Sequence, residues 1–421
     1  MSKIPAETLR KIPVLTCTLA TLAASFFLLV ACSQTAQAQT FNVLYAFGAG
    51  GDGASPWAGV TLDRNGNIYG TTVEAGHGNA GTVYELKNHN GTWLLTALHE
   101  FLPANGDGAY PLSRVVFGPD GRLYGTTSGG GASGYWGTVY TLSPPVTFCR
   151  SVQCYWDETI IYSFNGTQGG GDPGWADPVF DRSGNLYGTA QQGGQDAFGV
   201  VYELTRSGGT WTESVLHSFS IPEGISPAGS VTFDQAGNIW GTTTSGEQGS
   251  AYGSIFELSP SGSGWTSNIV HLFQGGPNDG ASSYSGLTVD ASGHIYGTTA
   301  FGGHNGSGAA FQLTASGGGW NYGLGYTGFT GGTGPWGTMV MDAAGNFYGT
   351  SLFAGAHGYG AVFKLTPSNG GWTYTSLHDF TGGNDGQHPY GGVTFDANGN
   401  LYGTAADGGR YGRGVVWEIV P

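Results

Sequence analysis

The sequence predicts an all-β fold, a seven-bladed β-propeller whose blades are four-stranded antiparallel sheets. Three observations support this prediction: one short motif recurs along the chain, four apolar segments recur with it, and one segment is left over at each end of the array. The motif reads Gly-Asn-Ile-Tyr-Gly-Thr-Thr at residues 66–72, and its second glycine returns at Gly70, Gly125, Gly188, Gly241, Gly297, Gly349 and Gly403. Copies at such a near-constant spacing indicate a repeat architecture.

The four apolar segments of the first repeat are each short enough to be a strand. The first, residues 60–63, ends in aspartate, and a short turn leads from it into the motif, as is typical of a β-hairpin. The motif at 67–72 is β-branched and aromatic, which predicts the second strand. A glycine-rich loop precedes the third strand at 81–86, and the fourth ends at Phe101. No sustained helical period appears in this repeat or the others, so we expect essentially no helix.

The two ends of the array complement each other. Residues 41–47 resemble a fourth strand without its first three, and residues 414–419 resemble a third strand without its fourth. A propeller leaves only short, protected strand edges because its blades repeat around an axis. We therefore expect the N-terminal strand to complete the last blade and close the ring. An open β-solenoid, the competing architecture, does not need complementary leftover strands.

The composition agrees with many short strands and excludes some partners. Glycine accounts for 80 of the 421 residues, and 13% of the chain is aromatic. Because the glycines recur at fixed repeat positions, they indicate tight turns rather than disorder or collagen. The formal net charge is −15, only 10% of the residues are charged, and there is no basic stripe. We therefore expect no nucleic-acid partner, whereas cations, neutral glycans or other proteins suit this surface.

The first 38 residues have the features of a signal peptide. Positive residues precede an apolar run at 12–31, and a small-x-small cleavage site follows at 36–38. Cleavage there leaves residues 39–421 as one exported seven-repeat domain, secreted or periplasmic, with no transmembrane span. A lipobox-like sequence offers a second interpretation, in which Cys32 carries a lipid anchor.

The body of the chain resembles a bacterial tandem-repeat family called GloVer-containing (choice-of-anchor). The family repeat has three separated pieces, which appear here at residues 101–111, at 184–189 followed by a Gly-Gly pair, and at 81–86. The resemblance covers all the repeats and implies an exported, propeller-like protein. The family brings no established reaction, so the resemblance implies no catalytic residue.

Histidine and tyrosine share one position in the fourth strand of the repeats. This position holds Tyr45, His99, Tyr162, His217, His271 and His378. An exchange between these two residue types predicts a packed, hydrogen-bonding role on the outermost strands rather than metal coordination.

A second recurrent position is acidic. It lies eleven residues before the aspartate that ends the first strand, or before Gly118, which takes the place of that aspartate in the second repeat. It holds Asp52, Asp107, Glu223, Asp279 and Asp385. In the third repeat Asp172 comes two residues late, and the sixth repeat has Gly331. One interpretation is structural, because Asp-Gly forms tight turns. The other is a rim of carboxylates around the channel mouth that binds Ca²⁺, a cation that prefers oxygen ligands.

A third recurrent position, six residues before the same aspartate, is aromatic in five repeats. It holds Trp57, Trp175, Tyr284, Trp336 and Tyr390, with Leu112 and Ala228 in the other two repeats. These side chains either wedge between blades or line a concave mouth as a ligand-binding site, where aromatic faces would stack on sugar rings.

The remaining motifs favour structural roles. Cys149 and Cys154 lie in the longest repeat, and in an oxidising compartment this spacing predicts a small disulfide loop. The sequence contains no G-x-S-x-G, H-E-x-x-H or phosphate-loop motif. The aspartates that end the first strands recur too regularly to form a catalytic acid and base, which need different environments.

The sequence therefore favours an exported, non-catalytic propeller that binds a glycan or a protein at its channel face. Two alternatives stay open: an enzyme acting on polysaccharide, either a lyase or a hydrolase, and a structural surface scaffold. Symmetric rings of residues favour binding or structure, whereas one irregular polar cluster would favour catalysis.

Overall fold

The computed structural model describes residues 39–421 except 49, 133, 146–153, 247–251 and 263. The predicted signal peptide, residues 1–38, and the candidate lipid attachment site Cys32 lie outside the described residues. Within the described part of the chain, no helix has the length and apolar character needed to span a membrane.

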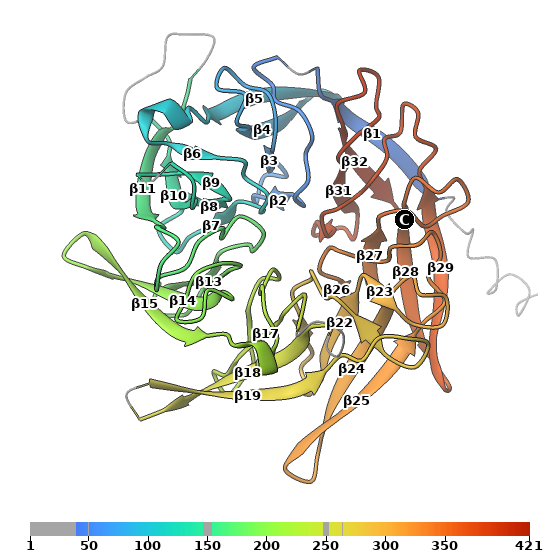
Figure 1. Cartoon of the computed structure of the whole chain (residues 1–421). Coiled ribbons are helices and arrows are strands. Elements are labelled where there is room, and N and C mark those ends of the chain that lie inside the picture. Colours follow the sequence, from blue (N-terminus) through green and yellow to red (C-terminus); the bar gives the residue numbers. More distant parts are fainter. Residues whose placement is uncertain (1–38, 49, 133, 146–153, 247–251, 263) are drawn as a thin grey trace, which may run out of the picture. The chain divides into compact units, whose positions relative to one another are not determined.

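Seven four-stranded antiparallel sheets follow one another along residues Thr40–Val420, as the sequence predicts (Figure 1). The short first strands surround the central channel. They are β2 (Thr61–Leu62), β7 (Val116–Phe117), β12 (Val179–Phe180), β16 (Thr232–Phe233), β21 (Thr288–Val289), β26 (Val340–Met341) and β30 (Thr394–Phe395).

The motif forms the second strand of each blade. These strands are β3 (Ile68–Thr72), β8 (Leu123–Thr127), β13 (Leu186–Ala190), β17 (Ile239–Thr242), β22 (Ile295–Thr299), β27 (Phe347–Ser351) and β31 (Leu401–Ala405). Six of the seven are buried at every residue, which agrees with a position between two other strands of the same sheet.

Longer third and fourth strands complete each blade on its outer side. The third strands are β4 (Thr82–His89), β10 (Thr138–Ser143), β14 (Val200–Ser207), β18 (Ser254–Ser261), β24 (Ala309–Ser316), β28 (Ala361–Ser368) and β32 (Val415–Val420). The fourth strands are β5 (Thr92–Glu100), β11 (Asp157–Ser163), β15 (Thr210–Ser218), β19 (Gly264–Leu272), β25 (Gly319–Tyr326), β29 (Gly371–Asp379) and β1 (Thr40–Ala46). We number the blades 1 to 7 by their first strands, from β2 to β30.

Helix is limited to two single turns among the described residues. The 3-10 turns η1 (Pro103–Asn105) and η2 (Ile221–Glu223) lie in loops between blades. Two further pairs of very short strands join loop segments: β6 (Gly108–Ala109) with β9 (Gly129–Gly130), and β20 (Gly280–Ala281) with β23 (Phe301–Gly302). The sequence did not indicate these small sheets.

The N-terminal strand closes the ring, which confirms the prediction from the leftover segments. In blade 7 the strand order is β1-β32-β31-β30, so the first strand of the chain lies beside the last (Figure 1). The antiparallel register runs from Thr40 opposite Val420 to Ala46 opposite Val415. At the inner side, Thr404 donates a hydrogen bond of 2.7 Å from its hydroxyl to the carbonyl oxygen of Ala58 in the segment that enters blade 1.

Apolar side chains of neighbouring blades form the core. Between blades 7 and 1, for example, Tyr402 and Val416 pack with Val60, Ile68 and Tyr84. Six further buried clusters of the same kind include contacts across the other blade boundaries. The hydrophobic effect therefore holds each blade to its neighbours.

Candidate functional site

The segments that enter the first strands converge at one end of the central channel. Their residues line a cavity of about 110 Å³. All five aromatic residues predicted for this position contribute to its wall: Trp57, Trp175, Tyr284, Trp336 and Tyr390. Leu112 lines the cavity at the same position in blade 2. We call these five aromatic side chains the aromatic mouth; their ligand-binding role stays a prediction.

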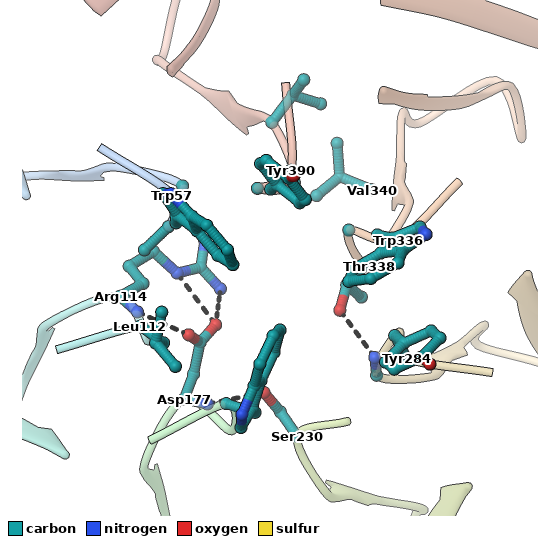
Figure 2. Close-up of a pocket in the computed structure, with 18 residues that line it drawn as sticks. Trp57, Leu112, Arg114, Asp177, Ser230, Tyr284, Trp336, Thr338, Val340 and Tyr390 are labelled. Carbon is teal, nitrogen blue, oxygen red and sulfur yellow. Dashed lines mark hydrogen bonds and ion pairs between the residues drawn. The ribbon is translucent and has the colours of Figure 1, made fainter. Parts of the chain in front are cut away.

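The rings of the aromatic mouth contact one another. Trp57 and Tyr390 stack face to face at 4.3 Å, and Tyr284 and Trp336 stack at 4.2 Å. Figure 2 shows these two stacks on different sides of the opening. Trp175 is instead tilted against its three aromatic neighbours, with ring centroids 6.0 to 6.5 Å away. The faces of Trp175 are therefore the least occupied by parallel stacking.

The motif holds these entry segments in place. The first threonine of the motif donates a hydrogen bond to a carbonyl oxygen in the entry segment of the next blade. Six blades have this contact, in the pairs Thr71–Ser113, Thr126–Ala176, Thr189–Gly229, Thr242–Ser285, Thr350–Gly391 and Thr404–Ala58. In each pair the acceptor directly follows the residue at the aromatic position. The motif thus fixes the backbone that carries the aromatic mouth.

A polar layer lies two residues after the aromatic position, on the same side of the extended segments. Arg114 and Asp177 form an ion pair there, with 2.9 Å between Nη2 and Oδ2 (Figure 2). The backbone N–H of Arg114 also donates to Asp177 Oδ1 at 2.8 Å. Ser230 accepts the backbone N–H of Asp177, and Thr338 accepts that of Gly286.

Glycine occupies this layer where blades 7 and 1 meet. A Cβ atom added to Gly59 would lie 2.7 Å from the carbonyl oxygen of Gly392, closer than a real side chain allows. The layer is therefore asymmetric, with its charged pair in blades 2 and 3. Arg114 and Asp177 were not among the predicted site residues, although their spacing of two residues from the aromatic position could have indicated them.

Burial raises the pKa of Tyr284 and of Tyr390 above the ordinary value of tyrosine. Both phenols are therefore neutral at physiological pH and can donate or accept hydrogen bonds. Together with the serine and threonine hydroxyls, they give the mouth neutral polar groups beside its aromatic faces.

The five predicted acidic residues lie beside the outermost strands. None of them belongs to the described residues that line the cavity. Each carboxylate instead lies next to the histidine or tyrosine of the fourth strand that precedes it in the chain. The pairs are Tyr45–Asp52, His99–Asp107, His217–Glu223, His271–Asp279 and His378–Asp385. These contacts agree with the hydrogen-bonding role predicted for the histidine and tyrosine position.

Hydrogen-bond donors of the loops also bind these carboxylates. Asp385, for example, accepts the backbone N–H of Thr381 at 2.9 Å and a hydrogen bond from His378 at 3.1 Å. Burial alone would raise the pKa of Asp385, but these hydrogen bonds outweigh burial and lower the pKa. The arrangement stabilises the loop between blades, and calcium binding at these positions stays a prediction.

The predicted disulfide is also untested. Cys149 lies outside the described residues, so its pairing with Cys154 stays a prediction. The described part of the insertion, from Cys154 onward, leads directly into β11.

Comparison with known sequences gives one family. The profile of the Gloeobacter/Verrucomicrobia repeat matches residues 30–157, 151–333 and 252–421, so the matches extend over the whole propeller. This confirms the resemblance seen in the sequence. No curated protein matches the chain significantly.

Solved structures with this fold include enzymes and surface proteins. An ulvan lyase of polysaccharide lyase family PL25 is 11% identical, with a TM-score of 0.53 over 90% of this chain and 95% of that one. A PL25 ulvan lyase bound to -[GlcA(1-4)Rha3S]- gives 11% identity and a TM-score of 0.52 over the same shares. PorZ, a surface component of the type-IX secretion system of Porphyromonas gingivalis, is 16% identical, with a TM-score of 0.50 over 87% of this chain and 46% of that one. These likenesses establish the fold alone.

Proposed function

This chain belongs to the Gloeobacter/Verrucomicrobia repeat family, and we propose that it is an exported, non-catalytic propeller that binds a glycan at its aromatic mouth. One observation carries the proposal: five aromatic side chains from five blades meet around a single opening and stay partly exposed to solvent. Burying them fully would be the more favourable arrangement for packing alone. Partly exposed aromatic groups at a concave opening are typical of a binding site.

The chemistry of the mouth suits a neutral glycan better than a protein segment. Aromatic faces can cover the apolar face of a sugar ring, and the hydroxyls of Tyr284 and Tyr390 can hydrogen-bond its hydroxyl groups. The charge of Arg114 is balanced by Asp177. The cavity of about 110 Å³ is well below the roughly 300 Å³ of ordinary small-molecule pockets. A glycan would therefore lie across the mouth, with Trp175 as its stacking platform.

Export is part of the proposal. The positive start of the chain, its apolar run and its small-x-small site support a cleaved signal peptide at residues 1–38. An extracytoplasmic protein would meet polysaccharides of the cell envelope or the surroundings. Attachment through Cys32 is the alternative to free release.

The experiment is a glycan-array screen followed by affinity measurement with the best ligand. Trp175→Ala should weaken binding at least about tenfold, equivalent to about 1.4 kcal/mol. The matched control is Leu112→Ala, because Leu112 occupies the same position in blade 2 but has no aromatic face. If the folded Trp175 variant binds the glycan as tightly as the wild type does, the aromatic mouth is not the binding site. Retention of no glycan at all would favour the structural scaffold.

A second candidate function is cleavage of a polysaccharide. The Arg114–Asp177 pair is the kind of irregular polar feature that would favour catalysis, since it lies in two blades of seven. A PL25 ulvan lyase has the same fold, which makes a lyase a reasonable alternative. Incubating each retained glycan with the protein and measuring unsaturated or shortened products decides between the two. If the wild type cleaves a glycan and the Asp177→Asn variant does not, the protein is an enzyme. If the wild type retains the glycan and releases no products, the result supports binding without catalysis.

A further inference from the structure

The outermost strands of neighbouring blades meet at one repeated contact. Each fourth strand has a histidine or tyrosine at the same position. This side chain faces the fourth strand of the next blade, at the residue that lies four positions before the histidine or tyrosine of that strand. His271 stacks on Tyr322 at 3.7 Å, and His378 stacks on Phe41 at 3.6 Å. Most of these contacts are aromatic or apolar.

At the contact between blades 1 and 2, Glu158 occupies the position of the stacking ring and faces a histidine. Glu213 occupies the same position between blades 2 and 3, but there it accepts a hydrogen bond of 3.1 Å from Tyr162. Glu158 in β11 approaches the pair formed by His99 of β5 and Asp107 of the following loop. The Nε2 atom of His99 is 3.0 Å from Asp107 Oδ2. One ligand atom from each of the three residues lies within 4.8 Å of the other two. Two blades thus bring a nitrogen ligand and two carboxylates together.

The cluster contains polar atoms without hydrogen-bond partners. Glu158 Oε1 is buried and has no partner among the described residues. The hydroxyl of the completely buried Tyr140 is also unpartnered, but so are those of Tyr84 and Tyr202 at the same position in blades 1 and 3, so Glu158 Oε1 is the atom that distinguishes this cluster. Burial raises the pKa of Tyr140, and the negative charges of Glu158 and Asp107 add to this increase. Buried polar groups usually have partners, and such groups deserve an explanation.

The buried carboxylate of Asp107 and the partly buried carboxylate of Glu158 also oppose each other's ionisation. Burial, followed by the negative charge of Asp107, raises the pKa of Glu158 well above its ordinary value. A bound cation would neutralise both carboxylates and satisfy the free oxygen.

We propose that His99, Asp107 and Glu158 form a binding site for a divalent transition-metal ion of the zinc class, located between blades 1 and 2. An imidazole nitrogen with carboxylate oxygens is a ligand set that Zn²⁺ accepts, whereas Ca²⁺ takes oxygen ligands. In a tetrahedral site with bonds of about 2.0–2.1 Å, neighbouring ligand atoms lie roughly 3.3 Å apart. The present spacing requires only a small closure of the side chains, and water would complete the coordination.

The site would join the two blades beside the longest insertion of the chain. Residues just before Glu158 already contact blade 1: Tyr155 donates a hydrogen bond to Glu100, and the Trp156 N–H donates to the Leu98 carbonyl at 2.7 Å. A metal ion would add a link at the same boundary. Its role would be structural and independent of the aromatic mouth.

The experiment uses protein produced without a histidine tag, stripped with a chelator and then titrated with Zn²⁺. We expect one zinc per chain to remain after dialysis. At a hundredfold excess over Kd, zinc should shift the folding equilibrium about a hundredfold and raise Tm by several degrees. Glu158→Gln should weaken zinc binding at least about tenfold, because it removes one of three protein ligands.

The matched control is His271→Gln, which disrupts the equivalent pair that faces Tyr322. This variant should bind zinc as the wild type does. His99→Gln provides a second loss-of-ligand variant if Glu158→Gln does not fold, as judged by circular dichroism. Absence of bound zinc in the wild type, or equal zinc binding by the wild type and the two ligand variants, would overturn the proposal.

Discussion

Each residue of the Tyr-Gly-Thr-Thr motif makes a different contact. In blade 1, the Tyr69 hydroxyl donates to Glu85 at 2.7 Å, and Gly70 lies against the ring of Tyr84. Thr71 reaches blade 2, and Thr72 pairs with Thr82 at 2.9 Å between their hydroxyl oxygens. The motif therefore recurs because it links strands within a blade and blades within the ring.

Replacing Gly70 with alanine should destabilise the protein. A Cβ atom there would lie 2.3 Å from the Tyr84 hydroxyl and 2.5 Å from Cζ, which forces a fully buried ring to move. Such overpacking typically costs about 1–3 kcal/mol. The free energy of unfolding of Gly70→Ala, measured by denaturant titration, checks this.

Gly323→Ala is the control for the Gly70 variant. Gly323 lies on the outer strand β25 with open space where its Cβ would be. Alanine there should be neutral or stabilise by a few tenths to about 1 kcal/mol, because it restricts the unfolded chain. Equal stability of the two variants would contradict the packing role of Gly70.

The sequence indicated some of these residue roles and not others. The repetition and composition of the motif predicted a strand in every blade, but not the partners of its side chains. The Thr71 contact could not be predicted, because its acceptor, Ser113, lies 42 residues away in the next blade. Tyr84 of β4 could not be assigned to Gly70 either, since the register of two strands sets that contact.

At the scale of the element, the hairpin between the first two strands depends on one aspartate. Asp342 accepts the backbone N–H groups of Ala344 and Asn346, both at 2.9 Å, and the Tyr348 hydroxyl at 3.0 Å. Asp63, Asp181, Asp234, Asp290 and Asp396 make equivalent contacts. These aspartates stabilise the turn by accepting its N–H groups. A structural role agrees with their regular recurrence in the sequence, which argued against a catalytic role.

Asp342→Asn should lower stability by about 1–2 kcal/mol at neutral pH, because the carboxylate accepts several hydrogen bonds. Burial would raise the pKa of Asp342, but the hydrogen bonds from Asn346 and Tyr348 outweigh it and lower the pKa. For a depressed pKa, the stabilisation is complete above the unfolded value of about 3.9 and is lost as pH falls through the folded value. The difference in Tm between wild type and variant should therefore shrink towards low pH.

The exposed Asp196 provides the control for this pH dependence. Asp196→Asn should leave the free energy of unfolding within about 0.5 kcal/mol of the wild-type value at every pH. A Tm difference for Asp342→Asn that stays constant from neutral to acid pH would contradict the role of the ionised carboxylate.

Loops were harder to predict than strands. The aromatic position lies at the cavity, which is one of the two arrangements that the sequence left open, because it is followed within a few residues by an inner strand. The acidic position was also expected at the channel, but five residues earlier the chain still lies beside the outer strand, where His271 contacts Asp279 at 3.1 Å. Sequence spacing gives the order of these residues, whereas the path of the loop depends on which side chain accepts its N–H groups.

At the scale of the whole molecule, the repeat count and the leftover strands gave both the number of blades and the manner of closure. The stacking of Trp57 on Tyr390 was not predictable, because it depends on how closely blades 7 and 1 approach across Gly59 and Gly392. The Glu158 cluster likewise needs contacts between two blades. The repeated features of the blades could thus be predicted from the sequence. The contacts that differ from blade to blade could not, because they depend on which residues of neighbouring blades meet.

Closure by β1 should dominate the stability of the ring. Phe41 stacks on His378 at 3.6 Å and contacts Trp417 at 6.0 Å, so β1 packs against blade 6 as well as completing blade 7. Deleting Thr40–Ala46 removes these contacts and the ladder to β32, and it exposes an unpaired edge that favours aggregation. We expect a loss of about 5 kcal/mol or more, because a fully buried phenylalanine is worth about 3–5 kcal/mol, the partly buried Phe41 somewhat less, and the hydrogen bonds of the seven-residue strand add to it. Thermal unfolding of the deletion variant and the wild type checks this expectation. Phe41→Ala should lose part of the same stability. Val43→Thr is the control, because Val43 is half-exposed and its replacement should cost little stability. A deletion variant that melts at the wild-type temperature would show that blades 1 to 7 hold together without the N-terminal strand.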